Sequence, residues 1–245
     1  MLGQDLPGRS IGAFFGILVW LSLPSAALAQ SQAPLPLPKS VVTPAPPAAA
    51  TIKPSVKTVR PGQKLVLDAN QRSLVDRVSL YLSTIQTLVG DFVQVGSDGS
   101  RAEGQFYLQK PGRVRFEYEP PSPIDITADG RLVSVRNRKL DTQDLFPLSQ
   151  TPLRFLLSES IDLVRETNII GVYSDNTFAT IVIEERQPLV GTSRLMLMFG
   201  AKDLQLKQWT VTDAQGFDTT VSVHNLDSVT RPDPKIFTIN TSKQN

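Results

Sequence analysis

The chain has 245 residues, of which 40% are hydrophobic and 20% charged, and it contains no cysteine. Disulfides, thiolate metal sites and a lipid-bearing cysteine are therefore excluded. The net charge is +2, but residues 30–64 hold five basic residues and no acidic one, so the rest of the chain is mildly acidic and does not favour nucleic-acid binding.

The first residues have the pattern of a secretory signal. Arg9 precedes an apolar run over residues 11–21, and Ala27-Leu28-Ala29 provides a small-x-small cleavage site. The apolar run is shorter than a transmembrane helix needs. We therefore expect residues 1–29 to be a cleaved signal peptide, with an uncleaved membrane anchor as the alternative.

Residues 30–64 are rich in proline and alanine and have no periodic apolar face. Such a segment cannot bury enough apolar surface to fold. We predict a basic, disordered linker there, a folded domain over residues 65–241, and a disordered tail over residues 242–245.

The folded part begins with a helical pattern. Apolar residues recur at spacings of three and four, as in an amphipathic helix: they are Leu74, Val78, Tyr81, Leu82, Ile85, Leu88 and Val89. Asp68 or Asn70 suits the N-cap and Gly90 suits the end. The pattern predicts one helix of about twenty residues.

After Gly90 apolar and polar residues alternate with the period of two that is typical of strands. Residues 113–118 are a clear example, because Val114, Phe116 and Tyr118 alternate with charged residues. Strands are predicted around residues 92–94 and 106–109, and at 113–118, 124–128, 132–135, 168–174, 178–185, 194–200, 206–213 and 217–224. Short strands joined by hairpin turns indicate one strongly curved antiparallel sheet.

Two stretches depart from simple alternation. Thr151 as N-cap and Pro152 at the first helical position predict a short helix that continues through Leu157. Residues 194–199 are apolar on both faces and include Met196 and Met198, so we expect an apolar layer on each side of that strand. The fold class is therefore mainly β (α+β), with one long helix and one or two short ones over the sheet.

We find no residue pattern that predicts catalysis. The sole histidine, His224, ends a predicted strand, and no carboxylates gather at metal-ligand spacing. There is no nucleophile-elbow serine and no phosphate-binding glycine loop. We therefore expect no enzyme activity, no metal and no cofactor. A curved sheet with an amphipathic helix instead suits an apolar ligand, since an acyl chain gains about 0.8 kcal/mol per buried methylene.

Several stretches, in this order, resemble the outer-membrane lipoprotein carrier protein LolA family. They are Asp91-Phe92-Val93-Gln94, residues 104–118, Ala128-Asp129-Gly130, residues 151–157 and residues 206–216. The resemblance implies an incomplete antiparallel β-barrel whose apolar cavity lies under a helical lid. It also implies a periplasmic chaperone that binds the acyl chains of lipoproteins.

The implied partners are acylated lipoproteins, a LolCDE-type inner-membrane ABC transporter and an outer-membrane lipoprotein receptor, and the chain is expected to act as a monomer. A carrier of another lipid or a glycolipid on the same fold is the alternative. An envelope hydrolase or a structural envelope protein is less consistent with the residues.

Candidate site residues follow from the shared strand faces and the resemblance. The candidate lining of the acyl-chain cavity is Phe92, Phe106, Leu108, Val114, Phe116, Ile126, Val133, Leu195, Leu197, Trp209 and Val211. The candidate lid residues are Leu74, Val78, Leu82, Ile85, Phe155 and Leu156. Lys110 stands where the family has an arginine that bonds to the lid, so Lys110, Arg113 and Arg115 are the candidate latch, with a solvated lysine as the alternative for Lys110.

Overall fold

The computed structural model describes residues 65–187 and 191–240, so the predicted signal peptide, linker and tail lie outside the described residues. The strands are β1 (Thr87–Val95), β2 (Arg101–Gln109), β3 (Arg113–Tyr118), β4 (Ile124–Asp129), β5 (Leu132–Asn137), β6 (Thr142–Pro147), β7 (Asn168–Ser174), β8 (Phe178–Gln187), β9 (Gly191–Gly200), β10 (Leu206–Thr212) and β11 (Asp218–Asp227). The helices are α1 (Ala69–Thr84), α2 (Leu153–Leu157) and α3 (Leu163–Glu166), and the 3₁₀ turns are η2 (Leu148–Gln150) and η3 (Pro234–Phe237).

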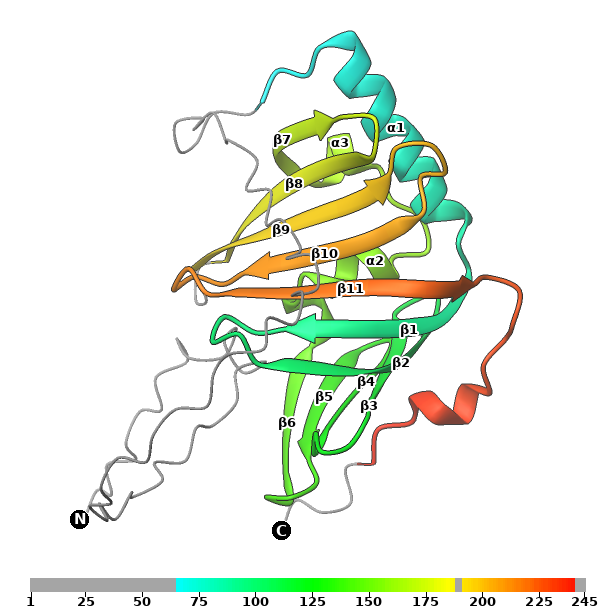
Figure 1. Cartoon of the computed structure of the whole chain (residues 1–245), viewed down its shortest axis with the longest axis vertical. Coiled ribbons are helices and arrows are strands. Elements are labelled where there is room, and N and C mark those ends of the chain that lie inside the picture. The colour runs from blue at the N-terminus through cyan, green and yellow to red at the C-terminus, as the bar shows by residue number, and fades with distance from the viewer. Residues whose placement is uncertain (1–64, 188–190, 241–245) are drawn as a thin grey trace, which may run out of the picture. The chain divides into compact units, whose positions relative to one another are not determined.

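All eleven strands form one sheet in the order β6-β5-β4-β3-β2-β1-β11-β10-β9-β8-β7 (Figure 1). Strands that are neighbours in the chain pair with each other, except β6 and β7, which are the two edges, while β1 pairs with β11. Within the described residues the sheet is therefore open. The predicted incomplete antiparallel barrel is confirmed.

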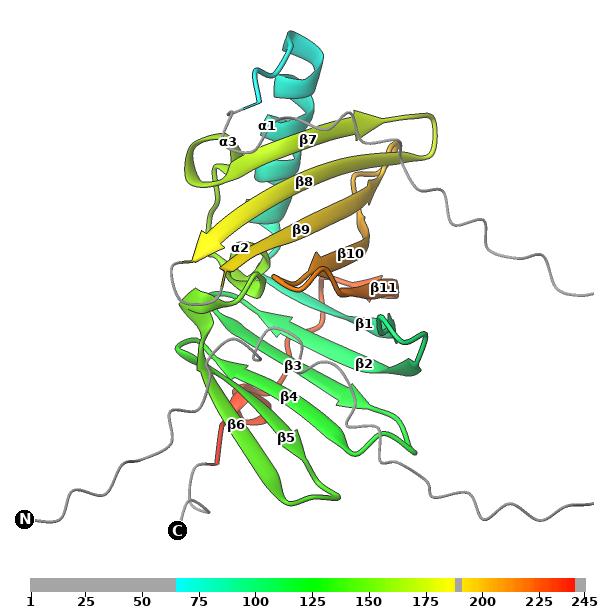
Figure 2. The same ribbon diagram turned by 90° about the vertical axis from the view of Figure 1, so that its left-hand side faces the viewer.

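The connection between β6 and β7 is the one link between consecutive strands that is not a hairpin, and it carries α2 and α3. The sheet curves, and α2 lies inside the curve (Figure 2). We call the face toward α1 and α2 the inner face, and these two helices the covering helices.

The alternation of the strands separates this inner face from the outer one. In β3, Val114, Phe116 and Tyr118 are buried and point inward, whereas the residues between them are half-buried or exposed. Phe92 packs edge to face against Phe116 and Tyr118, with ring centroids 5.2 and 4.9 Å apart. Aromatic contacts of this geometry add to the stability that burial provides.

Helix α1 begins where the sequence predicts but ends earlier. Asp68 is the N-cap and forms a capping box with Gln71. The helix ends at Thr84, so the expected helix of about twenty residues is wrong at its C-terminal end. Leu88 lies in β1, where the backbone pairs with both β2 and β11 and the side chain is buried on the inner face. Gly90 lies in this strand at a register shift, where an added Cβ would meet the His224 carbonyl oxygen at 2.9 Å.

Three local expectations also differ from the structure. Strand β6 is absent from the predicted strands, because its sequence shows no clear apolar alternation, and in the structure its residues are half-buried or exposed. Thr151 does not cap α2; its hydroxyl donates to the Leu148 carbonyl oxygen, and Pro152 occupies the N-cap without a side-chain hydrogen bond. On β9, Leu195 and Leu197 are buried, but Met196 is only half-buried on the outer face.

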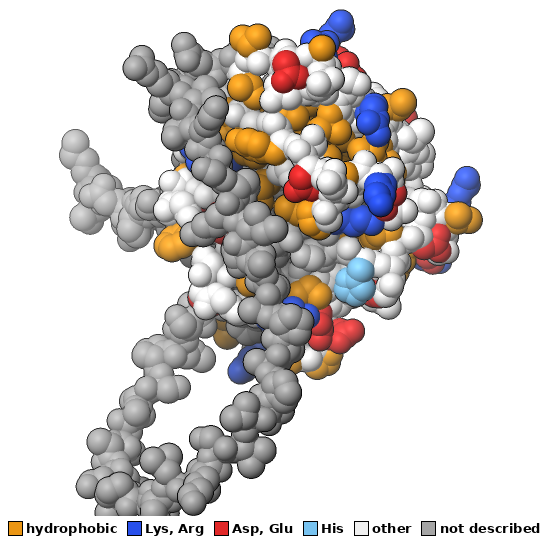
Figure 3. Space-filling view, turned by 45° about the horizontal axis from the view of Figure 1, so that its top comes forward, with side chains coloured by type: hydrophobic (Ala, Val, Ile, Leu, Met, Phe, Trp, Pro, Cys, Tyr) orange, Lys and Arg blue, Asp and Glu red, His pale blue; other side chains and the backbone are white. Residues whose placement is uncertain are grey.

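The outer face of β9 is thus not covered by an apolar layer from the described residues. Figure 3 shows hydrophobic side chains lying between charged ones on the face turned to the viewer. The outer face of β9 also carries Arg194, which is exposed and pairs with Glu184 at 3.5 Å. The second apolar layer expected on this strand is therefore not present among the described residues.

The core of the inner face is expected to carry much of the stability. Phe92→Ala removes a ring that is 1% exposed, so we expect the free energy of unfolding to fall by about 3–5 kcal/mol. Phe217→Ala is the matched control, because that ring is 53% exposed and its loss should cost less than about 0.5 kcal/mol. Urea unfolding of both variants measures the difference, and equal losses would contradict this assignment of the core.

Candidate functional site

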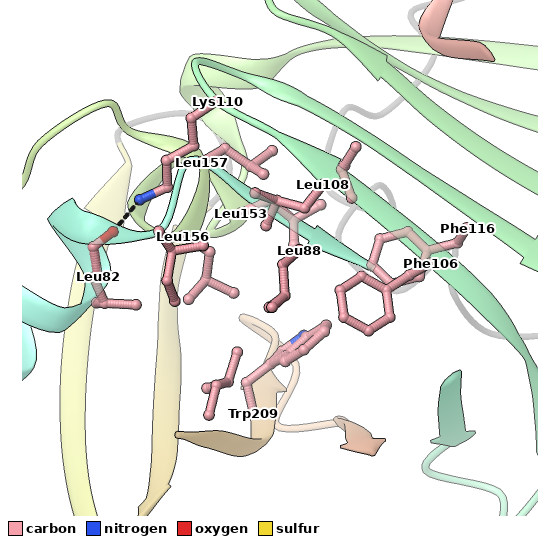
Figure 4. A pocket seen from close by; sticks show the side chains of 13 residues that line it. Leu82, Leu88, Phe106, Leu108, Lys110, Phe116, Leu153, Leu156, Leu157 and Trp209 are labelled. Carbon is pink, nitrogen blue, oxygen red and sulfur yellow. Dashed lines mark hydrogen bonds between the residues drawn. The ribbon is translucent and has the colours of Figure 1, made fainter. Parts of the chain in front are cut away.

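A small apolar cavity lies between the inner face of the sheet and the covering helices. Leucines of α1 and α2 point toward Phe106, Phe116 and Trp209 on the sheet (Figure 4). The lining residues are Leu82, Ile85, Leu88, Phe106, Leu108, Lys110, Val114, Phe116, Leu153, Leu156, Leu157, Leu206 and Trp209. Twelve of these thirteen side chains are hydrocarbon or aromatic, so the chemistry of the cavity is that of a solvent-excluding pocket.

The cavity has a volume of about 30 Å³. That space suits one or two water molecules, whereas pockets for small-molecule ligands measure about 300–1,000 Å³. The open hollow expected from the sequence is therefore nearly filled, and the side chains that fill it include Leu153, Leu156 and Leu157 of α2. A bound acyl chain would have to take the place of these leucines.

The structure brings together only part of the predicted lining. Phe106, Leu108, Val114, Phe116 and Trp209 line the cavity, as do the predicted lid residues Leu82, Ile85 and Leu156. The other predicted lining residues lie on the same face but away from the cavity: Phe92, Ile126, Val133, Leu195, Leu197 and Val211. The remaining predicted lid residues, Leu74, Val78 and Phe155, pack elsewhere in the core.

Sequence reasoning missed four lining residues. Leu88 is part of the predicted helix, and Leu206 is the first residue of β10, beside a register shift. Leu153 and Leu157 share a face of α2 with Leu156, so the helical spacing of residues 153–157 was the signal that could have identified them.

Lys110 is the polar member of the lining. It lies in the turn between β2 and β3, is 6% exposed, and donates a hydrogen bond from Nζ to the Leu82 carbonyl oxygen of α1 (Figure 4). Burial lowers the pKa of Lys110 from 10.5 to about 8, because the apolar surroundings disfavour the charged form. At neutral pH the side chain is still mostly an ammonium.

Arg113 and Arg115 are not brought to the covering helices. Arg115 pairs with Asp125 at 3.2 Å and donates to the Ile236 carbonyl oxygen at 3.0 Å, which holds η3 against the outer side of β3 and β4. Arg113 precedes the inward-facing Val114 and so shares the outer face with Arg115. Of the three predicted latch residues, only Lys110 reaches a covering helix.

Helix α2 has its own polar attachments. The Gly112 amide donates to the Leu157 carbonyl oxygen at 2.9 Å. Arg154 pairs with Glu185 of β8 at 2.7 Å, and its guanidinium lies 4.1 Å from the centre of the Phe155 ring. The sequence did not indicate the Arg154–Glu185 pair, because the partners are far apart in the chain and neither belongs to a motif.

Neither metal chemistry nor a membrane-spanning helix is indicated within residues 65–187 and 191–240. No three or more His, Asp or Glu residues of these ranges gather as they would around a metal ion. No helix in the same ranges combines the length and hydropathy that crossing a bilayer requires. His224 is exposed, with its Nε2 3.9 Å from Asp91.

The lowered pKa of Lys110 predicts a pH-dependent stability. The unfolded chain binds a proton at this lysine up to a higher pH than the folded one, so the free energy of unfolding should rise as the pH passes 8 toward 10.5. Lys110→Met removes this contribution, so the stability difference between the two proteins should change by about 1–2 kcal/mol between about pH 7.5 and 9.5.

Lys202→Met serves as the control, because Lys202 is exposed and its loss should leave the pH profile unchanged. Chemical unfolding at several pH values measures both differences. A flat difference for Lys110→Met would show that the ammonium is not held in an apolar environment.

The chain is similar in sequence to a family of known proteins. Residues 83–240 match the family described as outer membrane lipoprotein carrier protein LolA. An outer-membrane lipoprotein carrier protein of Chromohalobacter salexigens is 25% identical over 161 residues, which cover 62% of this chain and 75% of that protein. An uncharacterised protein of Rickettsia prowazekii is 27% identical over 115 residues, which cover 47% of this chain and only about half, 54%, of that protein.

Among solved structures, the LolA superfamily protein NE2245 from Nitrosomonas europaea aligns with a TM-score of 0.40 at 12% identity, covering 69% of this chain and 97% of that one. The family match covers residues 83–240, well over half of the chain. The match begins within α1 and runs through every strand of the open sheet to the end of the described residues. The chain therefore belongs to the LolA family.

Proposed function

We propose that the protein is a periplasmic carrier that binds the acyl chains of lipoproteins and keeps them from water. One observation carries this proposal: the inner face presents a continuous apolar surface whose cover includes a helix of only five residues. Leucines of that helix occupy the space that acyl chains would need. Exchange of leucine side chains for acyl methylenes replaces one apolar contact by another, so loading need not disrupt the sheet.

The polar contacts that hold the covering helices in place are suited to their displacement by a ligand. The polar contacts that tie α2 and the C-terminal part of α1 near the cavity include Lys110 with Leu82, Gly112 with Leu157, Arg154 with Glu185, and the Leu206 amide, which donates to the Tyr81 hydroxyl. A hydrogen bond of this kind contributes about 0.5–1.5 kcal/mol net, and more where a charge is involved. Burial of an acyl chain of a dozen methylenes is worth roughly 10 kcal/mol at about 0.8 kcal/mol each, which is set against the loss of these ties and of the leucine contacts that the chain replaces.

The proposed partners follow from the family. A LolCDE-type transporter in the inner membrane would release the lipoprotein and use the ATP, and a receptor in the outer membrane would accept it. The carrier itself needs no catalytic group. In the described residues, Glu184 and Glu185 are paired with arginines, as expected of structural carboxylates.

Release of a lipoprotein tests the proposal directly. Inner-membrane vesicles that contain the cognate transporter and a triacylated lipoprotein are incubated with ATP and the purified chain. We expect the lipoprotein to appear in a soluble one-to-one complex, measured by size-exclusion chromatography and mass spectrometry. If the lipoprotein stays in the vesicles while an authentic carrier releases it, the proposed function is wrong.

A variant that fills the cavity tests the site. Leu153→Trp adds more volume than the 30 Å³ available, so an acyl chain must compete with the indole, and we expect about ten-fold weaker binding of an acyl probe. Leu140→Trp is the matched control, since Leu140 is 51% exposed in the β5–β6 turn and should leave binding unchanged. Equal binding by both variants would place the acyl site elsewhere.

A further inference from the structure

Helix α2 lies between two points at which the chain is anchored. Before it, the amide and the hydroxyl of Thr151 both donate to the Leu148 carbonyl oxygen, and the Leu148 amide bonds to the turn between β4 and β5. After it, the Ile161 amide donates to the Ser83 hydroxyl of α1 at 3.1 Å. Residues 152–160 lie between these anchors, so their displacement requires no change in either one.

Within the described residues, two polar contacts join this segment to the sheet. The Leu157 carbonyl oxygen accepts from the Gly112 amide at 2.9 Å, and the Arg154 guanidinium binds the Glu185 carboxylate of β8 at 2.7 Å. The second contact is the one made by charged side chains. Gln187 Nε2 also donates to Glu185 Oε1 at 3.3 Å, so the carboxylate is held in position to receive the guanidinium.

The pair between Arg154 and Glu185 is close but incompletely hydrogen-bonded. The Glu185 side chain is 15% exposed and the Arg154 side chain 37%. Arg154 Nε and Glu185 Oε2 are buried without a hydrogen-bond partner among the described residues. Removal of charges from water offsets much of their attraction, and buried polar atoms without partners add to the cost. Displacement of α2 would let water reach both atoms, so this pair can hold the helix and still release it.

We propose that acyl chains enter between α2 and β8, and that the Arg154–Glu185 pair is the latch of this entrance. The inference rests on the proposed acyl-chain binding and adds the route by which the chain reaches its site. The leucines that fill the cavity, Leu153, Leu156 and Leu157, belong to the latched helix. One movement therefore opens the entrance and clears the space behind it.

Helix α1 has attachments of its own, which this movement leaves intact. The Leu206 amide donates to the Tyr81 hydroxyl at 3.2 Å, and Lys110 binds the Leu82 carbonyl oxygen. Neither contact involves residues 152–160. Lys110 and Arg154 therefore hold different helices, and release of α2 is a step separate from any movement of α1.

The absence of cysteine from the chain allows this movement to be measured. Leu156→Cys places a thiol on α2 at a side chain that is 5% exposed, and Val78→Cys places one on α1 at a side chain that is 0% exposed. Each is made in the full chain, alone and together with Glu185→Gln. The rate at which a maleimide modifies each thiol reports how often the helix that carries it leaves the core.

We expect Glu185→Gln to raise the modification rate at position 156 about five-fold, because a neutral amide binds the guanidinium more weakly than a carboxylate does. The rate at position 78 should not change. Arg154→Met should act in the same direction, and the double variant should react no faster than the faster single one, since the two residues form one contact. Glu103→Gln is the matched control, because it breaks an exposed pair with Arg101 on β2 and should change neither rate.

Uptake of a fluorescent acyl probe, followed by stopped flow, connects the latch to the ligand. Glu185→Gln should take up the probe faster than the wild type by a factor similar to the one found at position 156. An unchanged thiol rate at position 156 would overturn the proposal, and so would equal acceleration at positions 156 and 78, which would mean that the pair stabilises the whole fold.

Failure of the proposed function gives a different result. If neither protein takes up the probe, acyl-chain binding itself is wrong, while the thiol rates still decide whether the pair holds α2. An uptake rate that stays equal in the two proteins despite a faster thiol reaction would overturn the entrance between α2 and β8. If Glu185→Gln does not fold, Arg154→Met makes the same comparison from the other side of the pair.

Discussion

The fold depends on the burial of one apolar face by a sheet that does not close. A closed barrel of this many strands would cover its inner face with its own wall, but among the described residues β6 and β7 remain unpaired edges. The inner face must be covered by other elements, and the chain supplies them at two points: α1 before β1, and α2 and α3 in the one long connection. The cover is therefore made of segments that are not part of the hydrogen-bonded sheet.

The sequence predicted which strand residues share a buried face better than it predicted which of them lie beside the covering helices. A period of two places Phe106 with Leu108 on one strand face and Leu195 with Leu197 on another, and all four are buried. Only the first pair lines the cavity, because the place of α2 along the face is determined by tertiary contacts such as Arg154 with Glu185. The error at the end of α1 has a similar cause, since strand pairing of β1 overrides a helical spacing that includes Leu88.

The family resemblance and the structure together describe the role of Lys110 more fully than either does alone. By composition and spacing alone, Lys110 is a lysine that precedes a proline. The family pattern adds the expectation of a contact with the covering helices. The structure adds that this contact uses a neutral carbonyl and that the charge has no counter-ion in the cavity. Burial of this charge costs stability, because a methionine would be easier to bury than an ammonium.

The turn at residues 110–112 joins parts of the molecule that are distant in the chain. The backbone amide of Lys110 donates to the Gln86 carbonyl oxygen at 2.8 Å, its ammonium reaches Leu82, and the amide of Gly112 holds Leu157. This three-residue turn therefore bonds to the end of α1, to the entry to β1 and to the end of α2. A force applied to this turn acts on both covering helices at once, so the turn couples their movements.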